Sequence, residues 1–195
     1  MHFHVSLQDG QGRNVFAEAE EGKWNQAILH ALGGMRVTMG ESMLVFAPHA
    51  NSWRRFANQS YAPVSTNWGV NNRSVALRIP AGALAARRIE HRPSGVDANP
   101  YLVAATILAA IRHGLKHQID PGPDTTGNGH EDDEAATMPR DGRSAIEVAQ
   151  KSTFLKDALG EDMHRTFTAV KAAEYARVAR TIAAHDELGM AADDA

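Results

Sequence analysis

The sequence contains no cysteine in its 195 residues, which excludes a disulfide framework and a thiolate metal site. It also lacks any apolar run of membrane-spanning length, and its first residues have neither the basic start nor the apolar core of a signal peptide. Basic residues are not in excess, because the net charge is −3, so nothing favours nucleic acid as a partner. These absences predict a cytoplasmic protein of one domain, with no membrane or nucleic-acid partner.

Against this low net charge, one stretch of the chain is rich in arginine. Residues 48–95 hold a single carboxylate, Glu90, and seven arginines: Arg54, Arg55, Arg73, Arg78, Arg87, Arg88 and Arg92. A guanidinium group presents a fixed fork of donors that matches carboxylate and phosphate oxygens. The stretch therefore predicts a site for a small polyanion. The alternative is a solvated sheet face with alternating charges, and periodicity alone favours that alternative.

Strand-like alternation places these charges on one side of a sheet. Residues 74–79 alternate apolar and polar, and residues 88–92 place two arginines and Glu90 on a shared face. Together they predict a hairpin with one apolar and one arginine-lined face. Residues 1–7 predict another strand, with His2, His4 and Ser6 on one face. Imidazoles bind divalent metals or donate to phosphates, so the combination indicates a metal–nucleotide site.

Four ordered motifs carry a resemblance to a known family. MHFHVSL, APHANSWRRF, NRSVALRIP and RRIEHRPSGVDANPYLVAA resemble the catalytic domain of the glutamine synthetase family. The resemblance implies an α+β fold with a curved antiparallel or mixed sheet and helices. Family members are longer, and their motif begins before the His-x-His strand in which this sequence starts. We therefore expect an N-terminally truncated, C-terminal portion of the catalytic domain, inactive alone, or a start assigned at an internal Met.

Within residues 1–195 we expect three parts. Residues 1–119 would hold the sheet and the active-site motifs, residues 120–143 a flexible solvated loop without an apolar anchor, and residues 144–195 a helical tail. Helices are predicted at 24–32 (ended by the glycine pair 33–34), at 41–46, at 101–111, at 144–151, at 153–159 and from 162 to about 187. The helix at 101–111 is apolar nearly all round, which predicts a buried helix.

The resemblance implies a role for each matching residue. His2 and Glu90 match metal ligands, and His4 and Ser6 match positions that contact the nucleotide. Arg73 and Arg78 match arginines that hold the ATP phosphates, and Arg73 is also expected to act in catalysis. Arg55 and Arg92 match arginines that hold glutamate. For Arg54, Arg87 and Arg88 we expect structural pairing or solvent exposure.

Two positions depart from the family pattern. Ammonia-using members carry a glutamate before the Ala-Pro of this region, where this sequence has Tyr61, and many carry a lysine where it has Ala85. A neutral phenol cannot replace a carboxylate as an ammonium trap, because its ordinary pKa is near 10. An aromatic wall suits a larger amine instead. The resemblance is to the γ-glutamylpolyamine synthetase branch, and it rests on Tyr61, Trp68 and the motif ALRIP. The departure at Ala85 puts the affinity for nucleotide in question.

The resemblance thus implies an ATP-dependent ligase that joins glutamate to a putrescine-like amine through γ-glutamyl phosphate, with Mg²⁺ or Mn²⁺. Tyr61 would be the second catalytic residue, beside Arg73. Full-length family members form ring homo-oligomers. Two alternatives stay open at this point: an ammonia-using glutamine synthetase, and a remnant without catalysis that serves in binding or assembly.

Overall fold

The computed structural model describes residues 1–56, 60, 62–132 and 136–193, with side chains up to residue 181. Four short strands form one mixed sheet in the order β1-β4-β3-β2, namely β1 (Phe3–Val5), β4 (Ile89–His91), β3 (Leu77–Ile79) and β2 (Trp68–Val70). The pairs β1–β4 and β3–β4 are antiparallel, and β2–β3 is parallel. The sheet and its helices confirm the α+β class.

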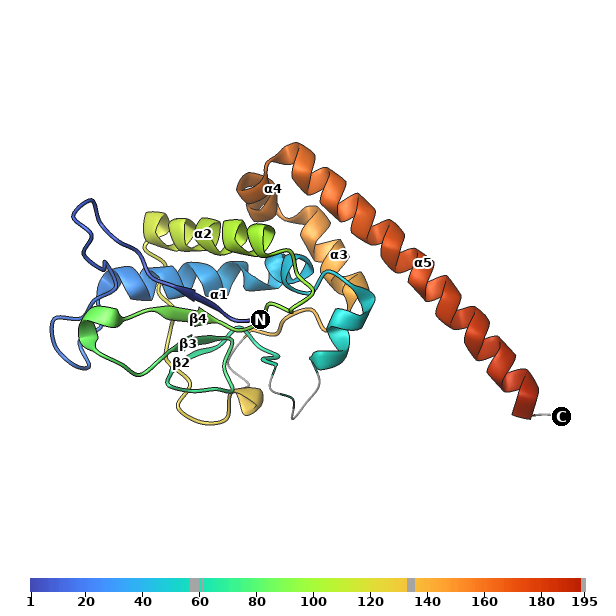
Figure 1. Cartoon of the computed structure of the whole chain (residues 1–195), viewed down its shortest axis with the longest axis horizontal. Helices are drawn as coiled ribbons and strands as arrows, with labels where there is room; N and C mark the ends of the chain where they lie inside the picture. Colours follow the sequence, from blue (N-terminus) through green and yellow to red (C-terminus); the bar gives the residue numbers. More distant parts are fainter. Residues whose placement is uncertain (57–59, 61, 133–135, 194–195) are drawn as a thin grey trace.

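Two long helices lie side by side against the sheet (Figure 1). They are α1 (Gln26–Phe46) and α2 (Pro100–His117). Asn25 caps the first and Asn99 the second, each with its side-chain oxygen accepting from the first turn, and Pro100 occupies the first helical position of α2.

The helix expected at 24–32 and the one expected at 41–46 are in fact a single helix, so the predicted stop at the glycine pair is wrong. Gly34 lies where α1 meets α2: a Cβ on it would collide with the backbone of Ala110 and Gly114. Gly33 approaches the backbone of Ile119 in the same way. The glycines therefore serve close helix packing, which outweighs their low helix propensity.

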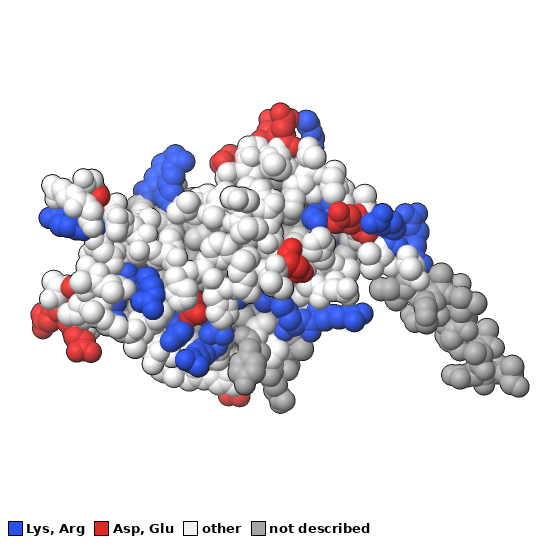
Figure 2. All heavy atoms as spheres, viewed as in Figure 1, with Lys and Arg blue, Asp and Glu red and all other residues white. Residues whose placement is uncertain are grey.

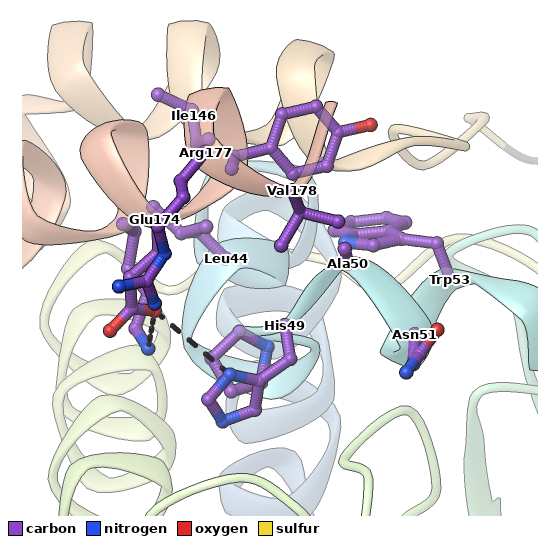
Figure 3. A pocket seen from close by; sticks show the side chains of 13 residues that line it. Leu44, His49, Ala50, Asn51, Trp53, Ile146, Glu174, Arg177 and Val178 are labelled. Carbon is purple, nitrogen blue, oxygen red and sulfur yellow. Dashed lines mark hydrogen bonds and ion pairs between the residues drawn. The ribbon is translucent and has the colours of Figure 1, made fainter. Parts of the chain in front are cut away.

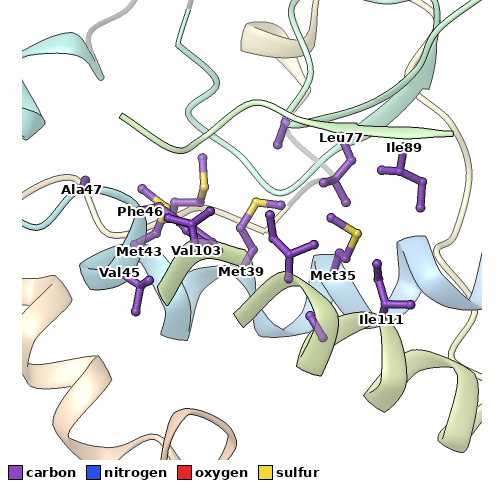
Figure 4. Close-up of a cluster of buried hydrophobic side chains, with 14 of the residues drawn as sticks. Met35, Met39, Met43, Val45, Phe46, Ala47, Leu77, Ile89, Val103 and Ile111 are labelled. Atoms are coloured by element: carbon purple, nitrogen blue, oxygen red, sulfur yellow. The ribbon is translucent and has the colours of Figure 1, made fainter. Parts of the chain in front are cut away.

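Methionines of α1 fill the space between the helices and the sheet. Met35, Met39 and Met43 are almost fully buried, in the same core cluster as Leu77 and Ile89 of the strands (Figure 4). Unbranched thioether side chains adapt to irregular gaps. This core holds β3 and β4, the strands that carry the predicted site, against a rigid helical layer.

The helix predicted at 101–111 is longer than expected and is not buried all round. Val103, Ile107 and Ile111 are buried, but Tyr101 is 84% exposed and Leu108 is 52% exposed. Uniform hydrophobicity in the sequence did not distinguish the two faces.

The C-terminal part is helical, with α3 (Gly142–Lys151), α4 (Thr153–Leu159) and α5 (Glu161–Asp193). The helix α5 extends away from the body of the molecule (Figure 1). No helix within the described ranges is long and apolar enough to cross a membrane.

Short 3₁₀ helices occupy three connections: η1 (Ala50–Arg55), η2 (Leu84–Ala86) and η3 (Gly129–Glu131). The segment 120–143 differs from expectation, because it does have an apolar anchor. Met138 is 4% exposed in the core, and Trp68 Nε1 donates to the carbonyl of Gly122 at 3.0 Å.

Candidate functional site

Three side chains of the predicted site form a row across the sheet. The register aligns His4 of β1 and Arg78 of β3 with Glu90 of β4, which lies between them. Residues in register on adjacent strands point to the same face. We call His4, Glu90 and Arg78 the site row. The strand alternation in the sequence therefore translates into direct neighbours in space.

The carboxylate of Glu90 is the centre of this arrangement. Its Oε2 accepts a hydrogen bond from Nη1 of Arg78 at 2.9 Å, and its Oε1 lies 3.0 Å from Nδ1 of His2. His4 Nε2 is 3.8 Å from the same oxygen. Because the Glu90 side chain is only 6% exposed, these partners supply the polar contacts that water would otherwise provide.

Burial and neighbouring charges set the charge states of Glu90 and His2. Burial alone would raise the pKa of the Glu90 carboxyl, but the hydrogen bond and charge of Arg78, with His2 and Arg92, hold that pKa below its ordinary value. Burial, together with the charge of Arg92, lowers the pKa of His2, although Glu90 opposes the shift. Near neutral pH the site therefore presents an ionised carboxylate beside an uncharged imidazole.

Asn71 is a site neighbour that the sequence did not reveal. Its Oδ1 accepts from Nη2 of Arg78 at 2.9 Å, so the guanidinium is fixed from two sides. The backbone of Asn71 is left-handed, with φ of 50°, a conformation that asparagine tolerates better than most residues. The Asn-Asn pair after β2 was the available signal for such a turn.

Arg88 is likewise closer to the site than expected. Its Nε donates to Nδ1 of His4 at 3.3 Å, and Nη1 donates to the carbonyl of Ala86 at 3.4 Å. The expected structural pairing thus involves a predicted nucleotide contact. Because Nδ1 of His4 accepts this bond, Nε2 is the ring nitrogen that carries the N–H, and it lies 3.8 Å from Oε1 of Glu90.

Other arginines surround the site row. The pKa of Arg92 is lowered from its ordinary value. Burial is the main cause, the charges of Arg78 and Arg73 act in the same direction, and Glu90 opposes them. These mutual effects place Arg73 and Arg92 in the same electrostatic cluster. Arg73 is exposed at the protein surface. Figure 2 shows basic side chains grouped over the sheet side of the molecule, with acidic atoms between them.

Arg55 approaches from the end of η1. Its Nη2 donates to the carbonyl of Pro93, its guanidinium lies 4.1 Å from the ring centre of Phe56, and Asp97 raises its pKa against the stronger effect of burial. Asp97 also accepts a hydrogen bond from Ser52 of η1. The segment after β4 therefore fixes the helix that carries Arg55.

Two of these arginines keep a buried donor unused. The Nε atoms of Arg55 and Arg78 are buried and have no hydrogen-bond partner among the described residues. A buried unsatisfied donor is costly. An anionic ligand that accepts from these groups would remove that cost, which is consistent with a polyanion site.

The remaining predicted positions are less informative. Ser6 is exposed, one residue beyond β1, and Arg54 is exposed on η1. Arg87 is structural, as expected: its Nε donates to Oε1 of the buried Glu18 at 2.7 Å. Ala85 is exposed in η2. Tyr61 lies outside the described residues.

The donor set fits a divalent metal in part. His2 and Glu90 offer one nitrogen and one carboxylate oxygen, which suit Mn²⁺ and, for the oxygen, Mg²⁺. Across residues 1–56, 60, 62–132 and 136–193, no group of three or more His, Asp or Glu side chains is arranged to hold a metal ion. A complete site would thus need further oxygen ligands.

Known proteins of similar sequence identify the family of this chain. The family model described as "Glutamine synthetase, catalytic domain" matches residues 1–188. The chain is 40% identical over 182 residues to γ-glutamylputrescine synthetase PuuA of Escherichia coli, covering 93% of this chain and 38% of that protein. It is 38% identical to γ-glutamylethanolamide synthetase GlnA4 of Streptomyces coelicolor, covering 83% of this chain and 34% of that protein.

Two further comparisons extend this result. Glutamine synthetase of Pyrococcus woesei is 36% identical, with 90% of this chain and 40% of that protein covered. A solved GmaS/ADP complex superimposes with a TM-score of 0.82 at 29% identity, covering 92% of this chain and 43% of that one. The chain thus spans about two fifths of the length of these relatives. It belongs to the glutamine synthetase family, whose catalytic-domain model it matches along almost its entire length.

Proposed function

We propose that this chain supplies the arginine- and histidine-lined part of the active site of an ATP-dependent ligase. The ligase would join the γ-carboxylate of glutamate to an amine through γ-glutamyl phosphate. The observation that carries the proposal is the Glu90 carboxylate, held between His2 at 3.0 Å and Arg78 at 2.9 Å on one sheet face. Such an assembly can bind a metal ion and a phosphate oxygen next to each other.

The roles follow from the reaction's charge demands. Attack of a carboxylate oxygen on the terminal phosphate of ATP brings two anions together, and negative charge is distributed over phosphoryl oxygens. Arg73 and Arg78 would hold those oxygens, and the exposed position of Arg73 would let it follow the transferring group. His4 and Ser6 would contact the nucleotide.

Two further arginines would hold glutamate. Arg55 and Arg92 are the proposed carboxylate anchors, since an arginine fork binds a carboxylate in a bidentate manner. The contacts of Arg55 to Pro93 and Phe56 restrict its guanidinium to one region. A pre-positioned anchor costs less entropy on binding and helps to align the reacting carboxylate.

Mg²⁺ or Mn²⁺ would be held by His2 and Glu90 with further ligands. When bound, the ion would offset negative charge on the phosphate oxygens. The chain's own contribution is the charge state: the lowered pKa values of His2 and Glu90 keep the imidazole uncharged and the carboxylate ionised near neutral pH, the forms in which each side chain can bind a metal ion.

We propose a putrescine-like diamine or polyamine as the second substrate. Support comes from Tyr61, which stands where ammonia-using members carry a glutamate, and from the 40% identity to the E. coli γ-glutamylputrescine synthetase. Ammonia is the alternative substrate, supported by the 36% identity to a glutamine synthetase. A ring homo-oligomer working in the cytoplasm is part of the same proposal.

A chimera tests the proposal. In the E. coli γ-glutamylputrescine synthetase, the region matched over 182 residues would be replaced by this chain. Phosphate release with ATP and glutamate would then be measured with putrescine, spermidine, ethanolamine and ammonium. We expect putrescine or spermidine to give kcat/KM at least roughly a hundredfold above ammonium, about 2.7 kcal/mol of discrimination.

Matched variants identify the cause. Tyr61→Glu should shift the preference toward ammonium, whereas Tyr61→Phe should retain the preference for the diamine. Equal or better turnover with ammonium in the unmodified chimera would favour a glutamine synthetase instead. A chimera that folds and binds ATP but releases no phosphate with any amine would support the binding or assembly role.

A further inference from the structure

A cavity of about 330 Å³ lies between the C-terminal end of α1, η1, α3 and α5 (Figure 3). None of its lining residues belongs to the site row. Its walls are largely apolar and include Leu44, Trp53, Ile146, Tyr175 and Val178. A volume of this size is at the lower end of the range for small-molecule sites, and it suits a body of one or two rings.

The aromatic wall is built by close packing. Gly142, the first residue of α3, lies next to Trp53 and Tyr175. A Cβ at this position would come within 2.5 Å of the Tyr175 ring and 3.1 Å of Trp53 Nε1. Only glycine lets the backbone at residue 142 lie this close to the two rings. Trp53 is 9% exposed and belongs to the hydrophobic core, so one wall of the cavity is an ordered part of the fold.

The charged side of the cavity has more cations than anions. Glu174 Oε2 accepts from Nζ of Lys171 at 2.8 Å and lies 4.0 Å from Nδ1 of His49. Arg177 also acts on this carboxylate through its charge. Glu174 neutralises one of two permanent cations, and one positive charge is left over for a ligand.

We propose that this cavity binds a small aromatic carboxylate, with its ring against Trp53 and Tyr175 and its carboxylate on Arg177. The apolar walls favour burial of a ring. The excess positive charge favours an anion and disfavours an amine of the same shape. Arginine is the residue type best suited to a planar carboxylate.

The position of the cavity connects it to the proposed glutamate site. Ala50, Asn51 and Trp53 of η1 line the cavity, and η1 ends at Arg55. A ligand that packs against η1 would therefore add contacts to the helix that ends at Arg55, and would act as a regulator of glutamate affinity. This regulatory step depends on the proposed function, whereas the binding step does not.

Binding is tested on the 195-residue chain itself, by calorimetry and ligand-observed NMR. Three probes share one ring system and differ in charge: indole-3-acetate, indole and tryptamine. We expect indole-3-acetate to bind most tightly and tryptamine most weakly. Arg177→Ala should weaken indole-3-acetate roughly tenfold, about 1.4 kcal/mol, because one charge-assisted contact is lost. The affinity for indole should hardly change.

Two variants serve as controls. Arg180→Ala removes an exposed arginine of the same helix that does not line the cavity, and binding should be unchanged. Val178→Trp fills the cavity and should abolish binding of all three probes. Tryptamine binding as tightly as indole-3-acetate would overturn the proposal, as would unchanged binding in Arg177→Ala or no binding by the unmodified chain. Because no turnover is measured, such a failure leaves the ligase proposal untouched.

Discussion

Nδ1 of His2 lies 3.0 Å from Oε1 of Glu90, although one residue stands at the start of the chain and the other in β4. The antiparallel pairing of β1 with β4 produces this proximity, because it sets His4 opposite Glu90 and leaves His2 at the adjacent position on the same face. An imidazole nitrogen and a carboxylate oxygen both have the chemistry of metal ligands, and near neutral pH the imidazole is uncharged and the carboxylate ionised.

We predict that Mn²⁺ binding to the chain depends on both residues. His2→Ala and Glu90→Gln should each weaken the affinity roughly tenfold or more, since each removes one ligand atom or its charge. Calorimetric titration with Mn²⁺ measures the effect. His117→Ala is the matched control, because His117 is exposed at the end of α2 and should leave the affinity unchanged.

The pH dependence of that binding provides a second check. The pKa values of His2 and Glu90 are both lowered, so protons compete with the metal only in more acidic solution than the ordinary pKa of histidine, about 6.5, would imply. The assignment of these ligands would be contradicted if the Mn²⁺ affinity had already fallen by half at a pH above neutral as the solution is acidified. Unchanged Mn²⁺ affinity in His2→Ala would contradict it as well.

Breaking the Arg78–Glu90 pair should destabilise the fold at neutral pH. The Glu90 side chain is 6% exposed in the unmodified chain. Arg78→Ala leaves this carboxylate without its main partner, and removing one member of a buried pair costs about 3 kcal/mol. Glu90→Gln added to Arg78→Ala should recover part of this loss. Urea unfolding of the single and double variants measures the coupling in a double-mutant cycle.

The same variant has a predictable response to acid. Without Arg78, burial raises the pKa of Glu90, so the carboxyl takes up a proton as the pH falls. Protonation removes the free-energy cost of the buried charge. The deficit of Arg78→Ala should therefore shrink between about pH 7 and about pH 4. A deficit that is constant over this range would show that lost packing, not charge, is the cause.

Two glycines of α1 should respond in opposite ways to the same substitution. Gly34→Ala places a methyl group against the backbone of Ala110 and Gly114, and we expect a loss of about 1–3 kcal/mol from overpacking. Gly40→Ala has open space, with Pro139 Cδ at 4.0 Å. It should stabilise the helix by roughly 0.5–1 kcal/mol. Thermal unfolding distinguishes the two, and equal effects would refute close α1–α2 packing.

The site row was predictable from the sequence because its residues obey strand alternation. Once His2 and His4 share one strand face, and Glu90 and Arg78 lie on the arginine-lined face of the hairpin, antiparallel pairing brings them together. The two-residue spacing that puts side chains on one face of a strand can be read directly from the sequence of that strand. Pairing between segments far apart in sequence was needed only to choose which strands are neighbours.

Other features depend on partners that local sequence does not specify. The glycine pair of α1 has the local signal of a helix stop, but α2 needs glycine there for close approach. No pattern in the sequence around Glu18 predicts that its side chain is buried in an ion pair with Arg87. Asn71 acts through a left-handed backbone conformation that fixes its amide next to Arg78.

His91 should make the fold sensitive to acid. Its ring is 1% exposed and lies 4.4 Å from the ring of Phe46. Burial, with the charges of Arg55 and His2, lowers its pKa from 6.5 to about 3. Between these values the unfolded chain binds a proton that the folded chain does not, so stability falls as the pH falls, by roughly 1.4 kcal/mol per pH unit below about 6.5.

The variant His91→Leu removes that proton site and keeps an apolar side chain against Phe46. It should lose stability near neutral pH, at a cost of about 1–3 kcal/mol, because Ser94 loses its hydrogen-bond partner and a branched side chain replaces a flat ring in a fully packed site. Its stability should nevertheless fall less steeply with acid than that of the unmodified chain. Urea unfolding at pH values between about 7 and about 5 measures both slopes. His117→Ala, which alters an exposed histidine, should retain the steep slope, and a His91→Leu slope equal to it would mean that His91 is protonated in the folded state.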